Sequence, residues 1–319
     1  MKYFKYALAA SFIGFMSIAS AGNYPDQPIR LIIPYAAGGT TDILGRVLAE
    51  RLEQDLGQTV VVENKAGANS MIGTAQVVRA KPDGYTLLLT SNVVVINEFL
   101  YKKPAYHAAD LTPIAPVAST PYFLIVNSKL PVKSTADFVK YAKEHPGDIA
   151  YGSSGAGGTP HLVGEMFQLK TGTKLLHVPY KGTGPATIDL AAGQVQAMFV
   201  GTPAVEPFIR QGTVRVLAAA ERDRAKQMPD TPTIEEQGFP GVFATNWFGV
   251  LGPKGMPSDV VERLTKSIAG IVKTDAFRSR MESLGAEPMV DVDGGLPSLV
   301  KDDQQRWKQV IDENGLKLQ

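Results

Sequence analysis

The stretch IRLIIPYAAGGTTDILGRVLAERLEQDL, residues 29–56, decides the fold of this chain. It begins with a short run that has few polar positions (29–33), passes through a glycine pair, and continues with helical spacing of apolar residues up to Gly57. A short apolar strand that leads into a helix is typical of a buried parallel strand in an α/β unit. The stretch IAYGSSGAGGTPHLVGEMFQLK, residues 149–170, repeats this layout.

The two glycine-rich loops, residues 34–42 and 151–161, each lie between an apolar run and a helix start. Glycine permits positive φ and leaves backbone amides uncovered, and a helix N-terminus offers unpaired N–H groups with a partial positive charge. We therefore expect the loops to form two halves of one anion site, for a carboxylate or a phosphate. The alternative is that these glycines only make tight turns.

Strands alternate with helices along the chain, which predicts an α/β fold. The expected strands are 29–33, 60–63, 85–90, 149–151, 175–178 and 195–200. The expected helices are 41–56, 70–80, 94–101, 135–144, 160–170, 185–193, 202–211, 257–274 and 296–314.

The chain is long enough for two domains, and the pattern predicts that it crosses between them twice. We expect lobe I to contain residues 22–122 and 223–319, and lobe II residues 123–222. The apolar runs at 114–118 and 123–126 carry the chain across, and the run at 215–220 returns it. Two crossings make a hinge.

The first 21 residues have the features of a secretory signal peptide. Lys2 and Lys5 supply the positive end, residues 7–18 the apolar core, and residues 19–21 an A-x-A cleavage site. The apolar core is shorter than the roughly 20 residues that a membrane span needs. We expect a mature chain that begins at Gly22 and is soluble in the periplasm.

The composition excludes several kinds of site. The chain has no cysteine, which excludes disulfides, thiolate metal sites and a cysteine nucleophile. Cleavage after Ala21 removes two of the 32 basic residues and none of the 31 acidic ones, so the mature chain is close to neutral. Near-neutrality argues against nucleic acid or a charged membrane surface as the main partner.

Three helix starts in lobe II carry proline at the first helical position. They are Thr159-Pro160, Gly184-Pro185 and Thr202-Pro203. Each follows a predicted strand, so they point to the carboxyl edge of the sheet, where open α/β sheets bind ligands. Backbone amides together with the hydroxyls of Ser153, Ser154 and Thr159 can then hold a carboxylate without any arginine.

Three better-known loop motifs are absent. The dinucleotide pattern that starts at Gly155 meets Pro160 where its last glycine belongs, and no P-loop occurs. The nucleophile-elbow pattern fails because Ala156 follows Gly155. These failures weaken the readings as a phosphate-cofactor enzyme and as a serine hydrolase, and we expect no cofactor.

The histidines show no metal-ligand spacing, and we expect no metal site. They are His107, His145, His161 and His177. His161 lies just inside the helix after the second loop, where it can donate to a ligand or fix the loop.

Asp42 occupies the matching place in the first loop. Because a carboxylate repels an anion, we expect Asp42 first to orient the loop and only second to contact ligand. Tyr180 and Lys181 precede another glycine loop and can face the cleft.

Six segments together carry a specific resemblance, which covers essentially the whole mature chain. They are Ile32–Asp42, Val62–Ala68, Lys81–Thr86, Tyr151–His161, Val178–Gly182 and Met228–Thr233. In these segments the chain resembles the Bug family, the TctC-like extracytoplasmic receptors of tripartite tricarboxylate transporters. The resemblance implies a type II periplasmic-binding-protein fold: two α/β lobes joined by two hinge segments, with a ligand enclosed between them.

The resemblance also implies which residues bind. In the family the two loops grip one carboxylate, largely through amides and ordered water, and the matching positions here are Tyr35, Gly39, Thr40, Ser153, Ser154, Gly157 and Thr159. We add Ser91, Asp42, His161, Tyr180 and Thr202 as candidate ligand-binding residues. Many family members have an acidic residue after the position of Phe199, whereas this chain has Val200 and then Gly201. We therefore expect an organic acid without an amine, and specificity that arises around Val200 and Thr202.

The leading interpretation is a monomeric periplasmic solute-binding protein, without enzymatic activity, that delivers a small carboxylate to a tripartite tricarboxylate transporter. The first alternative is a receptor of the same fold that presents its ligand to a sensor kinase. The second is a secreted hydrolase that uses Ser153 or Ser154 with His161, which the motif failures place well below the others.

Overall fold

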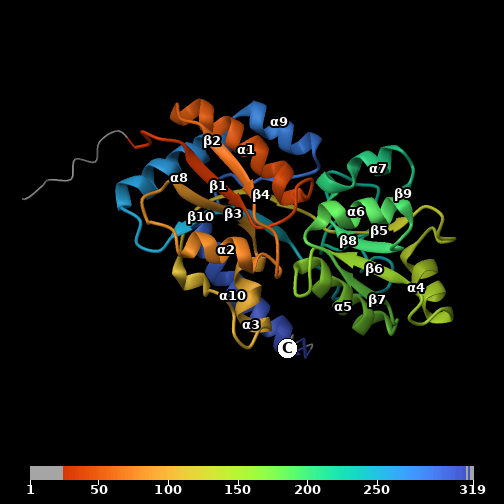
Figure 1. The fold of residues 1–319 in the computed structure, drawn as a ribbon. Helices are drawn as coiled ribbons and strands as arrows, with labels where there is room; N and C mark the ends of the chain where they lie inside the picture. The colour runs from red at the N-terminus through yellow and green to blue at the C-terminus, as the bar shows by residue number, and fades with distance from the viewer. Residues whose placement is uncertain (1–23, 314, 317–319) are drawn as a thin grey trace, which may run out of the picture.

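The computed structural model describes residues 24–313, 315 and 316, which form two α/β lobes side by side (Figure 1). The predicted signal peptide, residues 1–21, lies outside the described residues. Each lobe has one sheet with helices on both faces, as the alternation of strands and helices predicts.

The sheet of lobe I has the strand order β11-β4-β10-β3-β1-β2. Its strands are β1 (Ile29–Ile33), β2 (Val60–Asn64), β3 (Thr86–Ser91), β4 (Leu111–Thr120), β10 (Asn246–Pro253) and β11 (Glu287–Pro288). β1 pairs in parallel with β2 and β3, and β10 runs antiparallel between β3 and β4. β10, which comes late in the sequence, therefore lies at the centre of a sheet whose strands β1 to β4 come from the first part of the chain.

Helices cover both faces of this sheet. They are α1 (Thr40–Leu56), α2 (Met71–Val78), α3 (Val93–Leu100), α8 (Ser258–Lys273), α9 (Asp275–Ser283) and α10 (Gly295–Glu313), with the 3₁₀ turn η1 (Ala108–Asp110). Leu31 and Ile33 of β1 pack with α1, α8 and α9, whereas Ile32 packs with α2, α3 and α10. Successive strand residues point to opposite faces, so a strand covered on both faces is apolar at almost every position.

The sheet of lobe II has the order β7-β6-β8-β5-β9. Its strands are β5 (Phe123–Asn127), β6 (Ala150–Ser153), β7 (Leu176–Pro179), β8 (Ala197–Val200) and β9 (Val214–Ala219). Its helices are α4 (Thr135–Glu144), α5 (Thr159–Thr171), α6 (Thr183–Ala192), the 3₁₀ turn η2 (Thr202–Ala204) and α7 (Glu206–Arg210). α4 and α5 cover one face, and α6 covers the other.

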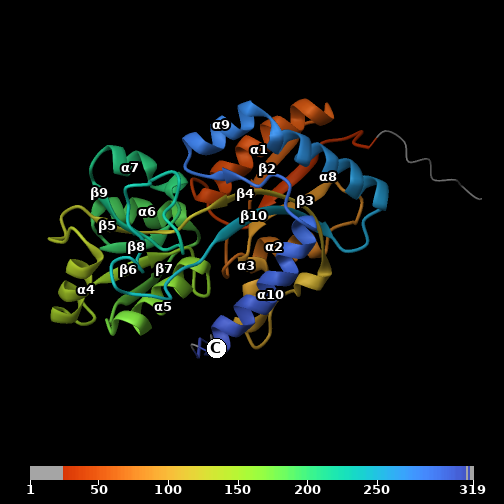
Figure 2. The same cartoon turned by 180° about the vertical axis from the view of Figure 1, so that it is seen from behind.

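Two connections join the lobes. The short one runs from Thr120, the last residue of β4, to Phe123, the first residue of β5. The long one, residues 220–245, leads from β9 back to β10, as the view from behind shows (Figure 2). Both predicted domain boundaries, at 122/123 and 222/223, fall within these connections.

Two sequence expectations about helices are wrong. The helix predicted from Thr202 to Gln211 is divided into η2 and α7, and Pro207 near the start of α7 explains the break because it has no N–H for a bond to the preceding turn. The short helix α9 was not predicted; it begins where Thr274 accepts a hydrogen bond from the Phe277 amide at 3.3 Å.

Candidate ligand-binding cleft

A small cavity lies between the lobes, at the carboxyl ends of the parallel strands. It has a volume of about 30 Å³ and is lined from lobe I by Tyr35, Gly39, Thr40 and Ser91, and from lobe II by Ser154 and Thr183. No residue that lines it carries a charged side chain, within the part of the chain that the structure describes. Any preference for an ion must therefore come from backbone groups and hydroxyls.

Three helix N-termini meet at this cavity. The N-cap residues of α1, α5 and α6 are Gly39, Gly158 and Gly182, and none of them makes a side-chain capping hydrogen bond. Thr40, Pro160 and Thr183, from the first turns of the three helices, all line the cavity. A helix start offers amides without an intrahelical partner and a partial positive charge, so the three starts make the cavity favourable for an anion without a cationic side chain. In this closed conformation the first amide of α1, at Thr40, bonds to Oγ1 of Thr183.

The two lobes touch through backbone groups next to the cavity. The Thr40 amide donates to Oγ1 of Thr183 at 3.0 Å, and the Ala36 amide donates to the carbonyl of Lys181 at 2.9 Å. A Cβ at Gly39 would lie 2.8 Å from Oγ1 of Thr183, and one at Gly184 would lie 2.6 Å from the Ala37 carbonyl. The contact at Gly184 is with backbone, so any side chain there would prevent this approach, whereas the contact at Gly39 is with a side-chain oxygen of Thr183.

The second loop also reaches across to lobe I. Thr159 donates through Oγ1 to Oδ1 of Asn92 at 2.9 Å, and the Tyr101 hydroxyl donates to the Ala156 carbonyl at 2.8 Å. Both loops thus contribute hydrogen bonds that hold the lobes together in this conformation.

The first loop is shaped by the buried carboxylate of Asp42. It accepts from the Gly38 amide at 2.9 Å, from Nδ2 of Asn64 at 2.9 Å and from Nε of Arg46 at 3.1 Å. Burial raises the pKa of Asp42, but the hydrogen bonds from Arg46, Gly38 and Asn64 outweigh it and hold the pKa below its usual range. Asp42 does not line the cavity, so it orients the loop.

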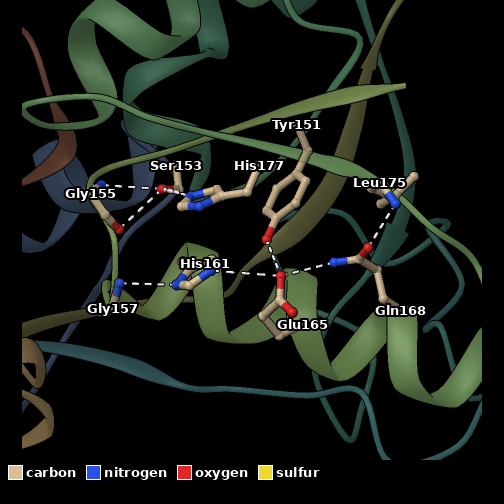
Figure 3. A network of polar contacts seen from close by, with 9 residues as sticks. All are labelled: Tyr151, Ser153, Gly155, Gly157, His161, Glu165, Gln168, Leu175 and His177. Carbon is tan, nitrogen blue, oxygen red and sulfur yellow. Dashed lines mark hydrogen bonds and ion pairs between the residues drawn. The ribbon is translucent and has the colours of Figure 1, made fainter. Parts of the chain in front are cut away.

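The second loop rests on a contact between buried Ser153 and half-buried His177 (Figure 3). Oγ of Ser153 lies 2.7 Å from Nε2 of His177, and it also accepts from the Gly155 amide at 3.2 Å. Burial, and then the neighbouring His161, lower the pKa of His177 to about 3. The neutral imidazole of His177 therefore holds the Ser153 side chain, which in turn holds the Gly155 amide of the loop.

His161 supports the same loop from the first turn of α5. Its ring stacks on that of His177 with centroids 3.9 Å apart, and its Nδ1 accepts from the Gly157 amide at 3.0 Å. Since an amide can only donate, the proton of neutral His161 lies on Nε2, which faces Oε1 of Glu165 at 3.6 Å. Burial lowers the pKa of His161 more than Glu165 raises it.

Glu165 connects this pair to Tyr151 of β6 and, through Gln168, to Leu175, the residue before β7 (Figure 3). It accepts from the Tyr151 hydroxyl at 2.7 Å and from Nε2 of Gln168 at 2.9 Å, and Gln168 in turn accepts from the Leu175 amide at 2.7 Å. The second loop is thus held by a continuous chain of polar contacts inside lobe II.

The structure brings some of the candidate residues together at the cavity and leaves others outside it. Those that line it are Tyr35, Gly39, Thr40, Ser91 and Ser154. Those that do not are Asp42, Ser153, Gly157, Thr159, His161, Tyr180 and Thr202. The second group comprises residues that support the loops or that make contacts elsewhere.

Tyr180 and Thr202 contact other parts of the chain. The Tyr180 hydroxyl donates to Asp189 of α6 at 2.7 Å, and Oγ1 of Thr202 donates to the Gly285 carbonyl at 3.2 Å. Gly201, next to Thr202, lines the cavity instead.

Sequence reasoning missed several residues of the wall. They are Thr41, Val93, Thr120, Tyr122, Pro160, Thr183, Asn246 and Phe248. Thr183 lies in the glycine loop 181–185, which precedes a predicted helix, so this signal was available, although the helix starts two residues earlier than the proline at position 185 predicts. Thr120 and Asn246 belong to no motif and reach the cavity only because β4 and β10 pair at the hinge.

The hydrolase interpretation paired Ser153 with the wrong histidine. Ser153 contacts His177, whereas Nδ1 of His161 is occupied by the Gly157 amide. Ser153 is fully buried and does not line the cavity, so a substrate in the cleft has no access to it.

In residues 24–313, no group of three histidine or acidic side chains has an arrangement that could hold a metal ion. Within the same range, no helix is both long and apolar enough to cross a bilayer.

Comparisons with known proteins agree with this architecture. Residues 44–316 match the family model of the tripartite tricarboxylate transporter family receptor. The chain is 37% identical over 308 residues to protein BugT of Bordetella pertussis, covering 96% of this chain and 94% of that one.

Two solved structures are similar over nearly their whole length. The periplasmic binding protein BugD has a TM-score of 0.89 and 37% identity, covering 93% of this chain and 100% of the other. The R. palustris protein Rpa4515, solved with adipate, has a TM-score of 0.88 and 34% identity, covering 92% of this chain and 98% of that one.

Proposed function

The chain belongs to the tripartite tricarboxylate transporter receptor family, and from that membership we propose that it captures a small organic carboxylate in the periplasm and delivers it to the membrane subunits of such a transporter. In this role the protein makes and breaks no covalent bond. The similarity to a structure that holds adipate supports a carboxylate as the ligand class.

One observation carries the proposal: three helices with glycine at the N-cap start at a cavity that, among the described residues, no charged side chain lines. Each helix start contributes roughly 0.3–1 kcal/mol to a nearby negative charge. Each hydrogen bond to the charged group adds about 1.5–3 kcal/mol. Together these contributions are enough to hold one carboxylate in a neutral pocket.

We assign the grip on that carboxylate to the two loops. Gly39 and Thr40 contribute backbone amides at the start of α1, and Ser154 contributes a hydroxyl from the opposite lobe. Ser91 and Tyr35, whose hydroxyls lie 3.4 Å apart, form the wall beside them. Water molecules can complete the contacts, because a bridging water keeps most of the enthalpy of a direct hydrogen bond.

Ligand entry requires the lobes to part. A cavity of about 30 Å³ is far smaller than an organic acid and compares with the space that one or two waters occupy. The two connections, residues 120–123 and 220–245, are the segments about which the lobes can rotate. Binding would then close the lobes on the ligand, and opening would release it.

The test is titration calorimetry of the mature chain against a panel of carboxylates that includes adipate, with inorganic phosphate as the control. We expect one chemical class of carboxylate to bind with unit stoichiometry and to raise the melting temperature, and phosphate to have no effect. Failure of every carboxylate to bind or to stabilise the protein would contradict the proposal.

A second experiment tests delivery. Cells that lack this chain should lose uptake of the carboxylate that calorimetry identifies, and the chain supplied in trans should restore it. Unchanged uptake would instead favour a receptor that presents the ligand to a sensor.

A further inference from the structure

Two hinge residues place polar side chains in the cleft, opposite the glycine loops. Thr120 ends β4 and Asn246 begins β10, and the two are direct partners in the antiparallel pairing of these strands. Both line the cavity, with Thr120 fully buried and Asn246 only 5% exposed. Because both residues lie where the connections leave lobe I, they stay next to the ligand whether the lobes are open or closed.

Each of these side chains has a buried oxygen without a partner. Oγ1 of Thr120 and Oδ1 of Asn246 make no hydrogen bond within the part of the chain that the structure describes. A buried polar atom left unpaired costs about 1–3 kcal/mol, so two of them side by side in a ligand cavity point to a group that a ligand supplies.

Gly201 keeps this corner of the cavity open. A Cβ at position 201 would lie 2.9 Å from Oγ1 of Thr120 and 3.5 Å from the Pro121 carbonyl. Any side chain there would cover the Thr120 hydroxyl. The glycine thus gives the ligand access to the two hinge residues.

The wall of the cavity itself offers nothing to balance a charge within the described chain; charged side chains, among them Glu221, Arg222 and Arg306, line a separate pocket that shares Thr120. The loop side already supplies the helix N-termini for one carboxylate. The adjoining acid, Glu221, accepts from the Tyr122 amide at 3.1 Å and from Oγ1 of Thr245 at 3.2 Å, both in the hinge. Because a buried charge without a partner is costly, a second carboxylate or an ammonium is disfavoured at this end.

We infer that Thr120, Asn246 and Gly201 form the distal end of the ligand site, and that they select a carboxylate whose far end is an uncharged hydrogen-bonding group, such as a hydroxyl or a carboxamide. A ligand hydroxyl donates to Oδ1 of Asn246 and accepts from the hydroxyl of Thr120. This inference rests on the proposed function, because it assumes that the loops hold the carboxylate.

The test is calorimetry with ligands matched in length and different only at the far end. At four carbons the set is butyrate, 4-hydroxybutyrate, succinamate, succinate and 4-aminobutyrate, and the same set is made with three, five and six carbons. At the length that fits, the hydroxyl or amide member should bind at least tenfold more tightly than the methyl-ended, dicarboxylate and amine-ended members.

Two variants separate this inference from a general loss of binding. Thr120→Val, which keeps the shape and removes the hydroxyl, should reduce the preference for hydroxyl over methyl at least fivefold. Asn246→Asp should shift the preference toward the amine-ended member. Thr135→Val is the matched control, since Oγ1 of Thr135 is also buried and unpartnered but lies at the start of α4, outside the cavity. It should keep the wild-type preference.

The possible failures are distinguishable. If the dicarboxylate binds as tightly as the hydroxyl member, or if Thr120→Val keeps the wild-type ratio while still melting like the wild type, the distal assignment is overturned and carboxylate binding stands. If no member of any length binds, both the proposed function and this inference are overturned.

Discussion

At the scale of single residues, the stacked pair His161 and His177 determines how the second loop is held. Both rings are neutral, because burial lowers the pKa of each and the two rings lie 3.9 Å apart. Neutral His161 accepts from the Gly157 amide through Nδ1, an acceptor that protonation would remove. The loop conformation is therefore linked to the protonation of this pair.

We predict that His177→Asn flattens the dependence of stability on pH below neutrality. The folded-state pKa of His177 is about 3, against 6.5 for the unfolded chain, so its contribution is fully present above about pH 6.5 and is lost as the pH falls toward 3. Between pH 7 and 4 the wild type should lose about 1–3 kcal/mol more unfolding free energy than the variant, after discounting for partial exposure. Urea unfolding across this range measures the difference.

The control for this prediction is Ser153→Ala, which removes the hydroxyl that contacts His177 and keeps both imidazoles. It should lower stability at every pH and keep most of the wild-type slope. A slope in His177→Asn equal to that of the wild type would show that the pair is not the source of the pH dependence.

At the scale of elements, the site depends on how closely the start of α6 approaches the first loop. A Cβ at Gly184 would meet the carbonyl oxygen of Ala37 at 2.6 Å and backbone atoms of Gly38 and Gly39 at 3.0 Å. These are backbone atoms of the opposite lobe, so no side-chain rotation can relieve the contact. Such a contact matters only when the lobes are together.

We predict that Gly184→Ala separates binding from stability. Alanine suits a helix better than glycine by roughly 1 kcal/mol, so the melting temperature without ligand should stay the same or rise. Affinity for the carboxylate identified by calorimetry should fall at least tenfold, because closure is blocked. Calorimetry and thermal unfolding of the same sample measure both effects.

Gly270→Ala is the matched control, because Gly270 is exposed on α8 and a Cβ there meets no atom within 4 Å. It should keep the wild-type affinity. Normal binding by Gly184→Ala would mean that the ligand is held without the close approach of α6 to the first loop.

At the scale of the whole molecule, two lobes with separate sheets are joined by two connections and by hydrogen bonds across the cleft. An apolar cluster also joins them, since Ile96 of α3 and Trp307 of α10 belong to the same buried cluster as the core of lobe II. Because the cavity is far smaller than an organic acid, we expect the lobes to open in solution when no ligand is bound.

We predict that a disulfide between Gly39→Cys and Thr183→Cys locks the lobes together. A Cβ at Gly39 lies 2.8 Å from the position of Oγ1 of Thr183, which places a sulfur at 183 within bonding reach, and the chain has no other cysteine. Without ligand, the oxidised protein should have a smaller radius of gyration than the reduced protein in small-angle X-ray scattering.

The single variant Gly39→Cys, treated with the same oxidant, should show no such difference. Equal radii for the oxidised and reduced double variant, with the disulfide verified by mass, would contradict opening in the absence of ligand.

Much of the fold could be predicted from the sequence, because it depends on local patterns. The alternation of buried strands and amphipathic helices identifies the α/β lobes, and glycines at the helix starts identify the loops that meet at the cleft. The misassigned helix at 202–211 failed for a local reason, since Pro207 interrupts its hydrogen bonds. Chain length and the apolar runs already predicted two lobes with two crossings, and the family resemblance identified the type of fold.

The residues that face the ligand could not all be predicted, because adjacent residues in one loop turn to opposite sides. Ser154 lines the cavity, whereas Ser153 is turned into lobe II against His177. Thr202 contacts Gly285, which is distant in the sequence, so its neighbour Gly201 is the residue that lines the cavity. Spacing alone does not determine such orientations.

The sequence by itself determined the class of fold, the two glycine loops and the absence of any thiol chemistry. Only the tertiary structure decided that Thr120 and Asn246 lie side by side in the cleft. These residues are more than a hundred positions apart, and they meet because the chain returns from lobe II to pair β10 with β4. Local preferences specify strands and loops, but long-range pairing of strands and the approach of two lobes specify which polar atoms remain for a ligand.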